Sequence, residues 1–214
     1  MDKALICGAG FSLKQLTPEI ASNFTTFCIN SAIYQLKEWD YAVITDLTYP
    51  STRWKNEINR VEQVIVCNQI DLSDYHPKDN TVHFERKYTG VYQNVIEGDK
   101  VIRGTDAVHI AVDIAIKLGF RKIYLLGVDL LYNDGKKYYN QTTSKNDWQV
   151  ENGVPLHYQW HKDKDTDLHL NNSYHYWENL VEKNKWLRNV IIDCSKGRLR
   201  NLFRQKNIYD VLAE

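Results

Sequence analysis

Apolar segments of strand length alternate with helix-forming segments along most of the chain, and this alternation constrains the fold more than any other feature. The predicted strands share near-continuous apolar character and comprise residues 3–8, 24–30, 41–46, 62–68, 122–129 and 189–195. The segments that predict helices comprise residues 13–21, 31–39, 54–61, 105–118, 174–188 and 198–206. Apolar strands separated by helices are typical of a parallel sheet that is covered on both faces. We therefore expect an α/β fold, with a Rossmann-like, mostly parallel sheet in a single domain over residues 1–214.

Two segments interrupt this pattern. Residues 81–92 are irregular and suggest a hairpin, whereas residues 131–170 are polar, rich in aromatic residues and histidines, and have little periodicity. A long segment of the second kind is typical of a lid over a binding site, so we expect a lid insertion there. His157 and His161 are four residues apart in it, but neither a helical pattern nor a nearby carboxylate completes a metal motif.

The glycine turn after the first predicted strand, Gly8-Ala9-Gly10, raises the question of nucleotide binding. Glycines let the backbone approach a ligand closely. The dinucleotide fingerprint, however, needs a third glycine where Leu13 stands, and the Gly-Lys-Ser/Thr sequence of the phosphate loop is missing. The turn is therefore consistent both with phosphate binding and with a plain connection from strand to helix.

Polar residues and glycines gather where the predicted strands end. In open parallel sheets, ligands bind beyond the carboxyl ends of the strands. The residues that the sequence places there are Gly8, Gly10, Asn30, Ser31, Asp46, Asn68 and Asp129.

Composition excludes some classes of function. Lysine and arginine total 27, aspartate and glutamate also total 27, and the formal net charge is zero, which argues against a dedicated binder of duplex nucleic acid. No apolar run reaches the roughly 18 residues of a membrane helix, and no signal peptide precedes the first strand. The four cysteines show no metal spacing and lie in or beside apolar runs, which favours buried thiols and a cytoplasmic location.

Four segments, taken in order, resemble a known group of enzymes. They are "ICGAGFSL", "FCINSAIY", "GTDAVHIAVDIAIKLGFRKIYLLGVDLLY" and "HYWENLVEKNKWLRNVIIDCSKGRLRNLF". The first resembles the N-terminal turn of family 42 sialyltransferases, Maf flagellin glycosyltransferases and archaeal 6-hydroxymethylpterin pyrophosphokinases. The others resemble the second strand, the helix with the following strand, and the C-terminal segment of the sialyltransferases. The chain departs from their pattern at Phe11, where they have proline, and at Asp106, where they have glycine.

The resemblance implies a glycosyltransferase whose sugar donor is activated by a nucleotide, most simply a CMP-linked, sialic-acid-like sugar. The donor or nucleotide site implied by the resemblance to the whole group comprises the turn residues Gly8, Gly10 and Ser12, the strand-end residues Asn30 and Ser31, and also Asp46, Thr105, Asp129 and Tyr132. Ser12 and Thr105 are also plausible helix caps, and Asn30 and Asp129 are plausible turn or cap residues.

His175 matches the histidine that acts as general base in the sialyltransferases and deprotonates the acceptor hydroxyl. An imidazole with a pKa near 6.5 suits this role at neutral pH. The family uses tyrosine hydroxyls against the donor phosphate in place of a metal, and Tyr132 lies within one residue of that position. The resemblance therefore implies no cofactor. The partners it implies are the nucleotide-sugar donor, a carbohydrate or other acceptor with a hydroxyl group, and further copies of the chain in a homo-oligomer.

Two other functions remain open at this point. Asp46 resembles the strand-end aspartate of the pyrophosphokinase and Maf branches and is a reasonable Mg²⁺ ligand, which would fit an ATP-dependent pyrophosphotransferase with Asp129 beside it. The chain could also be a nucleotide-binding module without catalysis. The basic C-terminal run 196–206 could contact phosphate, although a solvated helix face is the commoner reason for such a run.

Overall fold

The computed structural model describes residues 2–44, 60–66, 81–83, 96, 101–102, 106–131 and 163–212. Eight strands form one sheet in the order β5-β4-β3-β2-β1-β6-β7-β8, and all seven pairings are parallel. The strands are β1 (Lys3–Cys7), β2 (Thr25–Ile29), β3 (Trp39–Ile44), β4 (Val61–Val66), β5 (Thr81–His83), β6 (Lys122–Leu126), β7 (Ile191–Asp193) and β8 (Arg204–Gln205). The prediction of a parallel α/β sheet is confirmed.

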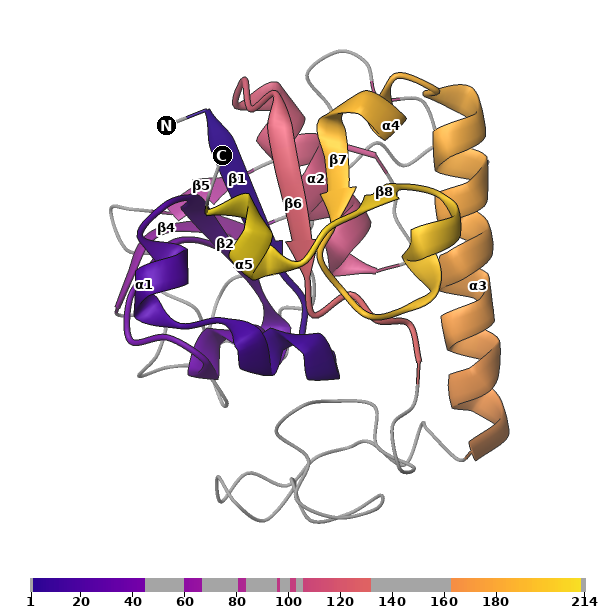
Figure 1. The fold of residues 1–214 in the computed structure, drawn as a ribbon, viewed down its shortest axis with the longest axis horizontal. Coiled ribbons are helices and arrows are strands. Elements are labelled where there is room, and N and C mark those ends of the chain that lie inside the picture. Colours follow the sequence, from indigo (N-terminus) through magenta and orange to yellow (C-terminus); the bar gives the residue numbers. More distant parts are fainter. Residues whose placement is uncertain are drawn as a thin grey trace.

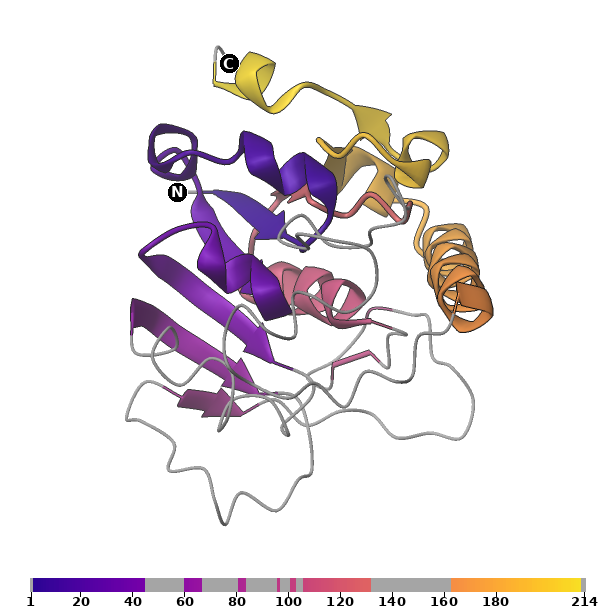
Figure 2. The same ribbon diagram turned by 90° about the horizontal axis from the view of Figure 1, so that it is seen from below.

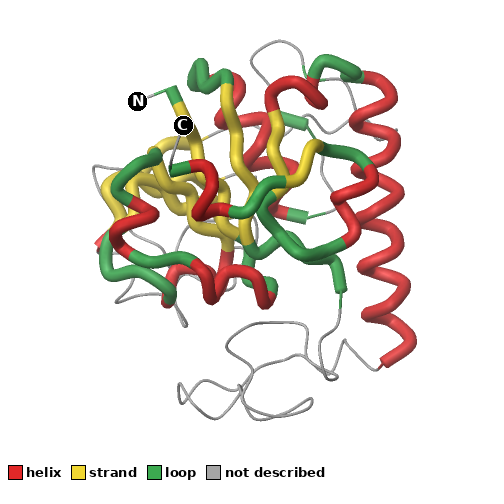
Figure 3. Tube along the Cα trace, viewed as in Figure 1, coloured by secondary structure: helices red, strands yellow, loops and turns green. Residues whose placement is uncertain are grey.

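Helices cover both faces of the sheet (Figures 1 and 2). The helices are η1 (Phe11–Gln15), α1 (Pro18–Ala21), η2 (Asn30–Tyr34), α2 (Ala107–Lys117), α3 (Asp163–Lys183), α4 (Leu187–Val190), η5 (Arg198–Asn201) and α5 (Ile208–Val211). Helices α2 and α3 pack on one face, and η1, α1, η2 and α5 pack on the other. Figure 3 shows the strands enclosed between the two helical layers.

The apolar strands explain this three-layer arrangement. Successive side chains of a strand point to opposite faces, so Ala4 and Ile6 of β1 join the core under α2, while Leu5 and Cys7 join the core under α1. All four side chains are fully buried. Strands that are apolar at every position therefore require cover on both sides.

Helix α2 begins and ends at residues that the sequence identifies. Asp106 is its N-cap and accepts hydrogen bonds from the backbone of Val108 and His109. Gly119 follows with a φ of +94°, a left-handed conformation that glycine adopts without strain. The helix is buried over most of its circumference, as its apolar sequence predicts.

Several element boundaries differ from the predictions. The helix expected over residues 13–21 is divided into η1 and α1, because Pro18 restricts the residue before it and Thr17 starts a new helix as N-cap. The expected helix 31–39 is only the short η2, and Trp39 already begins β3.

Larger differences occur in the second half. The helix expected from residue 174 begins at Asp163, so the last part of the expected lid is helical. The basic run expected as one helix is η5 followed by β8, which pairs with β7. The first residues of the expected hairpin form β5, parallel to β4, while the rest of that segment and the predicted helix 54–61, apart from its last two residues, lie outside the described residues.

Three of the four cysteines lie in the described residues, and Cys67 lies outside them. Cys7, Cys28 and Cys194 are buried free thiols, and burial raises the pKa of Cys194 to about 12. Within the ranges that the structure describes, no helix is both long enough and apolar enough to span a membrane.

Candidate functional site

Three turns meet at the edge where the parallel strands end, and Asp129 holds them together. One carboxylate oxygen of Asp129 accepts a hydrogen bond from the backbone N–H of Ser12 at 2.9 Å, in the turn after β1. The other oxygen accepts from the N–H of Lys196 at 3.1 Å, in the turn after β7. The main-chain carbonyl of Asp129 accepts from the N–H of Arg198 at 3.0 Å. Asp129 is only 6% exposed, so its contacts make it a structural tie between the turns.

Close packing between these turns explains their glycines. A side chain at Gly8 would place its Cβ 2.5 Å from the carbonyl oxygen of Gly127, and one at Gly10 would lie 2.7 Å from the same oxygen. Gly127 has a φ of +72°, and a Cβ on Gly197 would collide with the backbone of Asp129. The close approach that Gly8 and Gly10 allow is thus an approach between two turns of the protein.

The groups of this turn that were expected to bind phosphate have partners within the protein. The N–H groups of Gly8 and Gly10 donate to the carbonyls of Leu126 and Gly127, and that of Ser12 donates to Asp129. The Ser12 hydroxyl accepts from the N–H of Gly127 at 2.9 Å, and the residue is 5% exposed. The three groups expected to bind a donor are therefore used within the protein.

Two neighbouring amides of the same turn remain available. Among the residues that the structure describes, the N–H groups of Ala9 and Phe11 have no acceptor, and both residues are partly exposed. Backbone N–H groups that point out of a turn can bind an anion. The turn after β1 can therefore present two amides to a ligand, at positions that alternate with Gly8, Gly10 and Ser12.

Asn30 lies at the same edge, directly after β2. Its side chain is exposed, and its φ of +52° is a left-handed conformation that asparagine tolerates better than most residues. Leu130, next to Asp129, has a φ of +50° and has no such tolerance. Strained residues of this kind concentrate at functional sites, and no sequence pattern identifies Leu130 in advance.

Other predicted site residues lie beyond the described part of the chain. These are Asp46, Thr105 and Tyr132, together with most of the expected lid; Ser31 is the first residue after Asn30 in η2, and its side chain is not described. Within the described ranges, no group of three or more histidine, cysteine, aspartate or glutamate side chains could hold a metal ion. The roles of Asp46, Thr105 and Tyr132 remain predictions.

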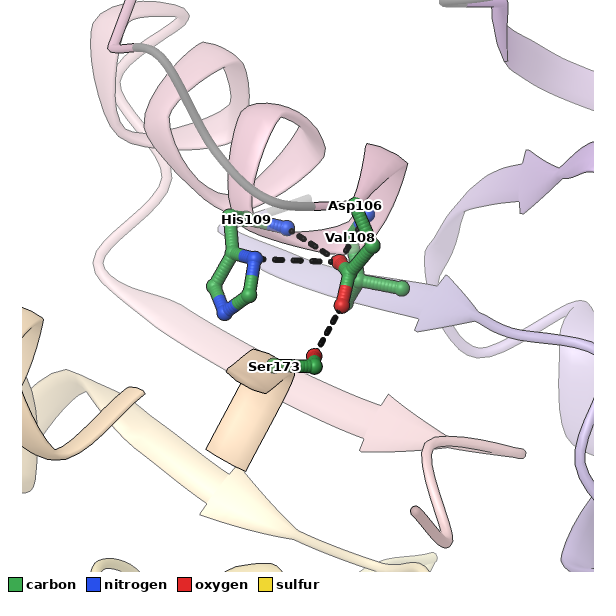
Figure 4. A network of polar contacts seen from close by, with 4 residues as sticks. All are labelled: Asp106, Val108, His109 and Ser173. Carbon is green, nitrogen blue, oxygen red and sulfur yellow. Dashed lines mark hydrogen bonds and ion pairs between the residues drawn. The ribbon is translucent and has the colours of Figure 1, made fainter. Parts of the chain in front are cut away.

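A buried network of Asp106, His109 and Ser173 joins the start of α2 to α3 (Figure 4). The Ser173 hydroxyl donates to one oxygen of Asp106, and the other oxygen lies 3.1 Å from Nδ1 of His109. Burial by itself would raise the pKa of Asp106, but the His109 charge and the hydrogen bonds from His109 and Ser173 hold it well below the usual value. These are the residue types of a hydrolase triad, but here aspartate is the central member, so no histidine can activate the serine. The network caps α2 and fixes α3 against it.

His175 has its own polar partner on α3, and no contact joins it to the strand-end turns among the residues that the structure describes. It is two residues from both Ser173 and Trp177, which are fully buried, and two residues correspond to about 200° of rotation around an α-helix. Its side chain is 67% exposed, and Nδ1 lies 2.8 Å from a carboxylate oxygen of Glu178 on the outer face of α3. The role of His175 as general base therefore remains a prediction.

Comparisons with solved structures identify the fold. CstII from Campylobacter jejuni, a sialyltransferase solved with the substrate analogue CMP-3FNeuAc, is 20% identical with a TM-score of 0.53, over 97% of this chain and 88% of that chain. The monofunctional alpha-2,3-sialyltransferase Cst-I from Campylobacter jejuni is 17% identical with a TM-score of 0.54, over 97% and 81%. A CST-II complex with a trisaccharide acceptor and CMP is 20% identical with a TM-score of 0.52, over 96% and 87%. At these identities the likeness establishes a shared fold.

Comparison with protein families reaches further than the fold. A search of curated proteins found no match. The family model described as 6-hydroxymethylpterin diphosphokinase MptE-like matches residues 1–135. Because this match spans more than half of the 214 residues, the chain belongs to the 6-hydroxymethylpterin diphosphokinase MptE-like family.

Proposed function

We propose that the chain is a glycosyltransferase that transfers a sugar from a CMP-linked, sialic-acid-like donor to an acceptor hydroxyl. The observation that carries this proposal is the arrangement at the strand-end edge, where Ala9 and Phe11 present backbone N–H groups beside the exposed Asn30. Two amides suit a phosphate, and an asparagine side chain can both donate to and accept from a base or sugar. The fold shared with sialyltransferases that were solved with CMP and with CMP-3FNeuAc supports this assignment.

In the proposed reaction, the acceptor oxygen attacks the anomeric carbon of the donor sugar. The bond between that carbon and the donor phosphate oxygen breaks, CMP leaves, and the acceptor proton passes to a general base. His175 is the base that the family resemblance implies, and its exposed imidazole on α3 is accessible to an acceptor. His157 and His161 of the expected lid are the alternatives that the sequence offers.

The second candidate is an ATP- and Mg²⁺-dependent diphosphokinase, and the family match over residues 1–135 favours it. Such a reaction needs carboxylates free to bind the metal. Both carboxylate oxygens of Asp129 already accept backbone hydrogen bonds, which argues against Asp129 as a ligand. Asp46 would then have to provide the metal site. A module that binds nucleotide without catalysis would show binding but no transfer to any acceptor.

Thermal unfolding with a panel of nucleotides separates these candidates. A ligand at 100 times its Kd stabilises the native state by about 2.7 kcal/mol. For a chain of this size that corresponds to a rise in Tm of about 5–10 °C. We expect this rise with CMP in the presence of a chelator. A rise only with ATP and Mg²⁺ would replace the glycosyltransferase proposal with the diphosphokinase.

We further propose that the protein acts in the cytoplasm, since free and buried thiols fit a reducing compartment. The acceptor is proposed to be a carbohydrate or another molecule with a hydroxyl group. Assembly into a homo-oligomer remains a prediction, which size-exclusion chromatography with light scattering would test.

A further inference from the structure

Arg198 is held beside the strand-end turns by three different contacts. Its backbone N–H donates to the carbonyl of Asp129, which places the residue next to the turn that follows β6. Its guanidinium Nη1 donates to the side-chain oxygen of Asn171 at 2.7 Å. The guanidinium carbon also lies 4.5 Å from the centre of the Tyr174 ring. A long, flexible side chain is thereby fixed in one orientation between η5 and α3.

The charge of this arginine is not matched by its neighbours. Asn171 and the Tyr174 ring are neutral. In the ranges that the structure describes, no carboxylate forms an ion pair with Arg198. An anionic ligand would supply the counter-ion that this partly exposed guanidinium lacks.

The geometry also leaves the arginine able to bind. A guanidinium has five N–H donors, and the hydrogen bond to Asn171 uses Nη1, while the Tyr174 ring lies against one face of the plane. The remaining edge donors can form the paired hydrogen bonds that match a carboxylate or a phosphate. Because the side chain is already ordered, little entropy is lost when a ligand binds.

We propose that Arg198 is a specificity-determining residue that binds an anionic group, a carboxylate or a phosphate, of the substrate at the strand-end site. This inference rests on the proposed function and adds to it the residue that recognises a negative charge of the substrate. The anionic group can belong to the donor or to the acceptor, since both reach the same edge of the sheet in a transfer reaction.

The test compares Arg198→Gln with Arg200→Gln in the full chain. Arg200 is two residues further along η5 and exposed, so its replacement removes the same charge without the contacts to Asn171 and Tyr174. Melting curves of both variants establish that they fold. Arg198→Lys is a second variant that keeps the charge but loses the planar fork, and we expect it to recover only part of the binding.

Binding is measured with CMP and with the unreactive CMP-3FNeuAc, and KM is measured with a neutral and a sialylated oligosaccharide acceptor. Arg198→Gln is expected to weaken nucleotide binding or to raise the KM for an acceptor at least about tenfold, as for loss of a charged hydrogen bond. Arg200→Gln is expected to have no effect on either quantity. Weaker binding of CMP-3FNeuAc alone identifies the donor carboxylate as the partner of Arg198. Weaker binding of both nucleotides identifies the donor phosphate. A KM raised only for the sialylated acceptor identifies the anionic group of the acceptor as the partner.

If Arg198→Gln, Arg200→Gln and the wild type have equal Kd and KM values with every ligand, Arg198 does not bind the substrate. Failure of the proposed function has a different signature, because the wild-type protein would then bind ATP instead of CMP. In that event the same two variants with ATP decide whether Arg198 binds a phosphate.

Discussion

Replacement of Asp193 by asparagine is predicted to change how stability depends on pH. Asp193 is the last residue of β7 and is fully buried, with one carboxylate oxygen accepting from the N–H of Ser195 at 2.9 Å. The other oxygen has no partner among the residues described. Burial raises the pKa of Asp193 from the usual 3.8 to about 6, and the negative charge of Asp129 acts in the same direction, although hydrogen bonds from Ser195 oppose it.

The sign and size of the effect follow from this difference. The native state keeps the Asp193 proton up to about pH 6, whereas the unfolded chain releases it near pH 3.8. Stability from this residue is therefore complete below pH 3.8, decreases as the pH rises to about 6, and is constant above that. The difference between the two pKa values, 3.8 in the unfolded chain and about 6 in the native state, corresponds to about 3 kcal/mol in the free energy of unfolding.

Urea unfolding of the wild type and Asp193→Asn at several pH values between about 4 and 8 measures this contribution. Subtracting the two free energies removes the acid denaturation that both proteins share. We expect the difference to favour the wild type by about 2–3 kcal/mol more at pH 4 than at pH 8. Asp210→Asn, in an exposed position of α5, is the control and should give a curve parallel to the wild type. If Asp193→Asn is also parallel, Asp193 is ionised in the native protein and the reasoning is wrong.

The structure makes three further predictions. Gly10→Ala should lower the free energy of unfolding, measured in urea, by about 1–3 kcal/mol. The turn leaves no room for a Cβ, although the φ of −72° at Gly10 would suit alanine. Unchanged stability would show that the turns can separate. Ser173→Ala should cost about 1.5–3 kcal/mol in urea unfolding at pH 7, because it removes a hydrogen bond to the charged N-cap of α2, and equal stability would show that this bond contributes nothing. His175→Ala should lower turnover in a transfer assay at least about a hundredfold while CMP binding survives, and turnover equal to that of the wild type would exclude His175 as the base.

Much of the fold could be predicted from the sequence because its signals are local. The apolar runs around Ile6 and Leu125 predict buried parallel strands, and Asp106 with Gly119 marks the ends of α2. Elements with weak local signals were predicted less well. The short β8 has two exposed residues in a basic run and exists because its backbone pairs with β7.

The sequence predicted where the candidate site lies, but only part of what its residues do. The sequence locates Gly8, Gly10 and Ser12 at the ligand edge, yet their amides bind the turn after β6 and leave those of Ala9 and Phe11 for a ligand. No sequence pattern indicates these two residues, because which N–H groups face outward depends on the partner turn.

The sequence by itself determined most of the central strands and helix α2, that the sheet is parallel and covered on both faces, and that its strand ends carry the candidate site. These properties depend on periodicity and caps within a few residues of each position. Tertiary structure alone decided that Asp129 bonds to Ser12 across 117 positions, that Arg198 lies over Tyr174, and that His175 faces outward. The physical reason is that hydrogen bonds and side-chain contacts between distant segments depend on how the layers pack, and local sequence does not encode that geometry.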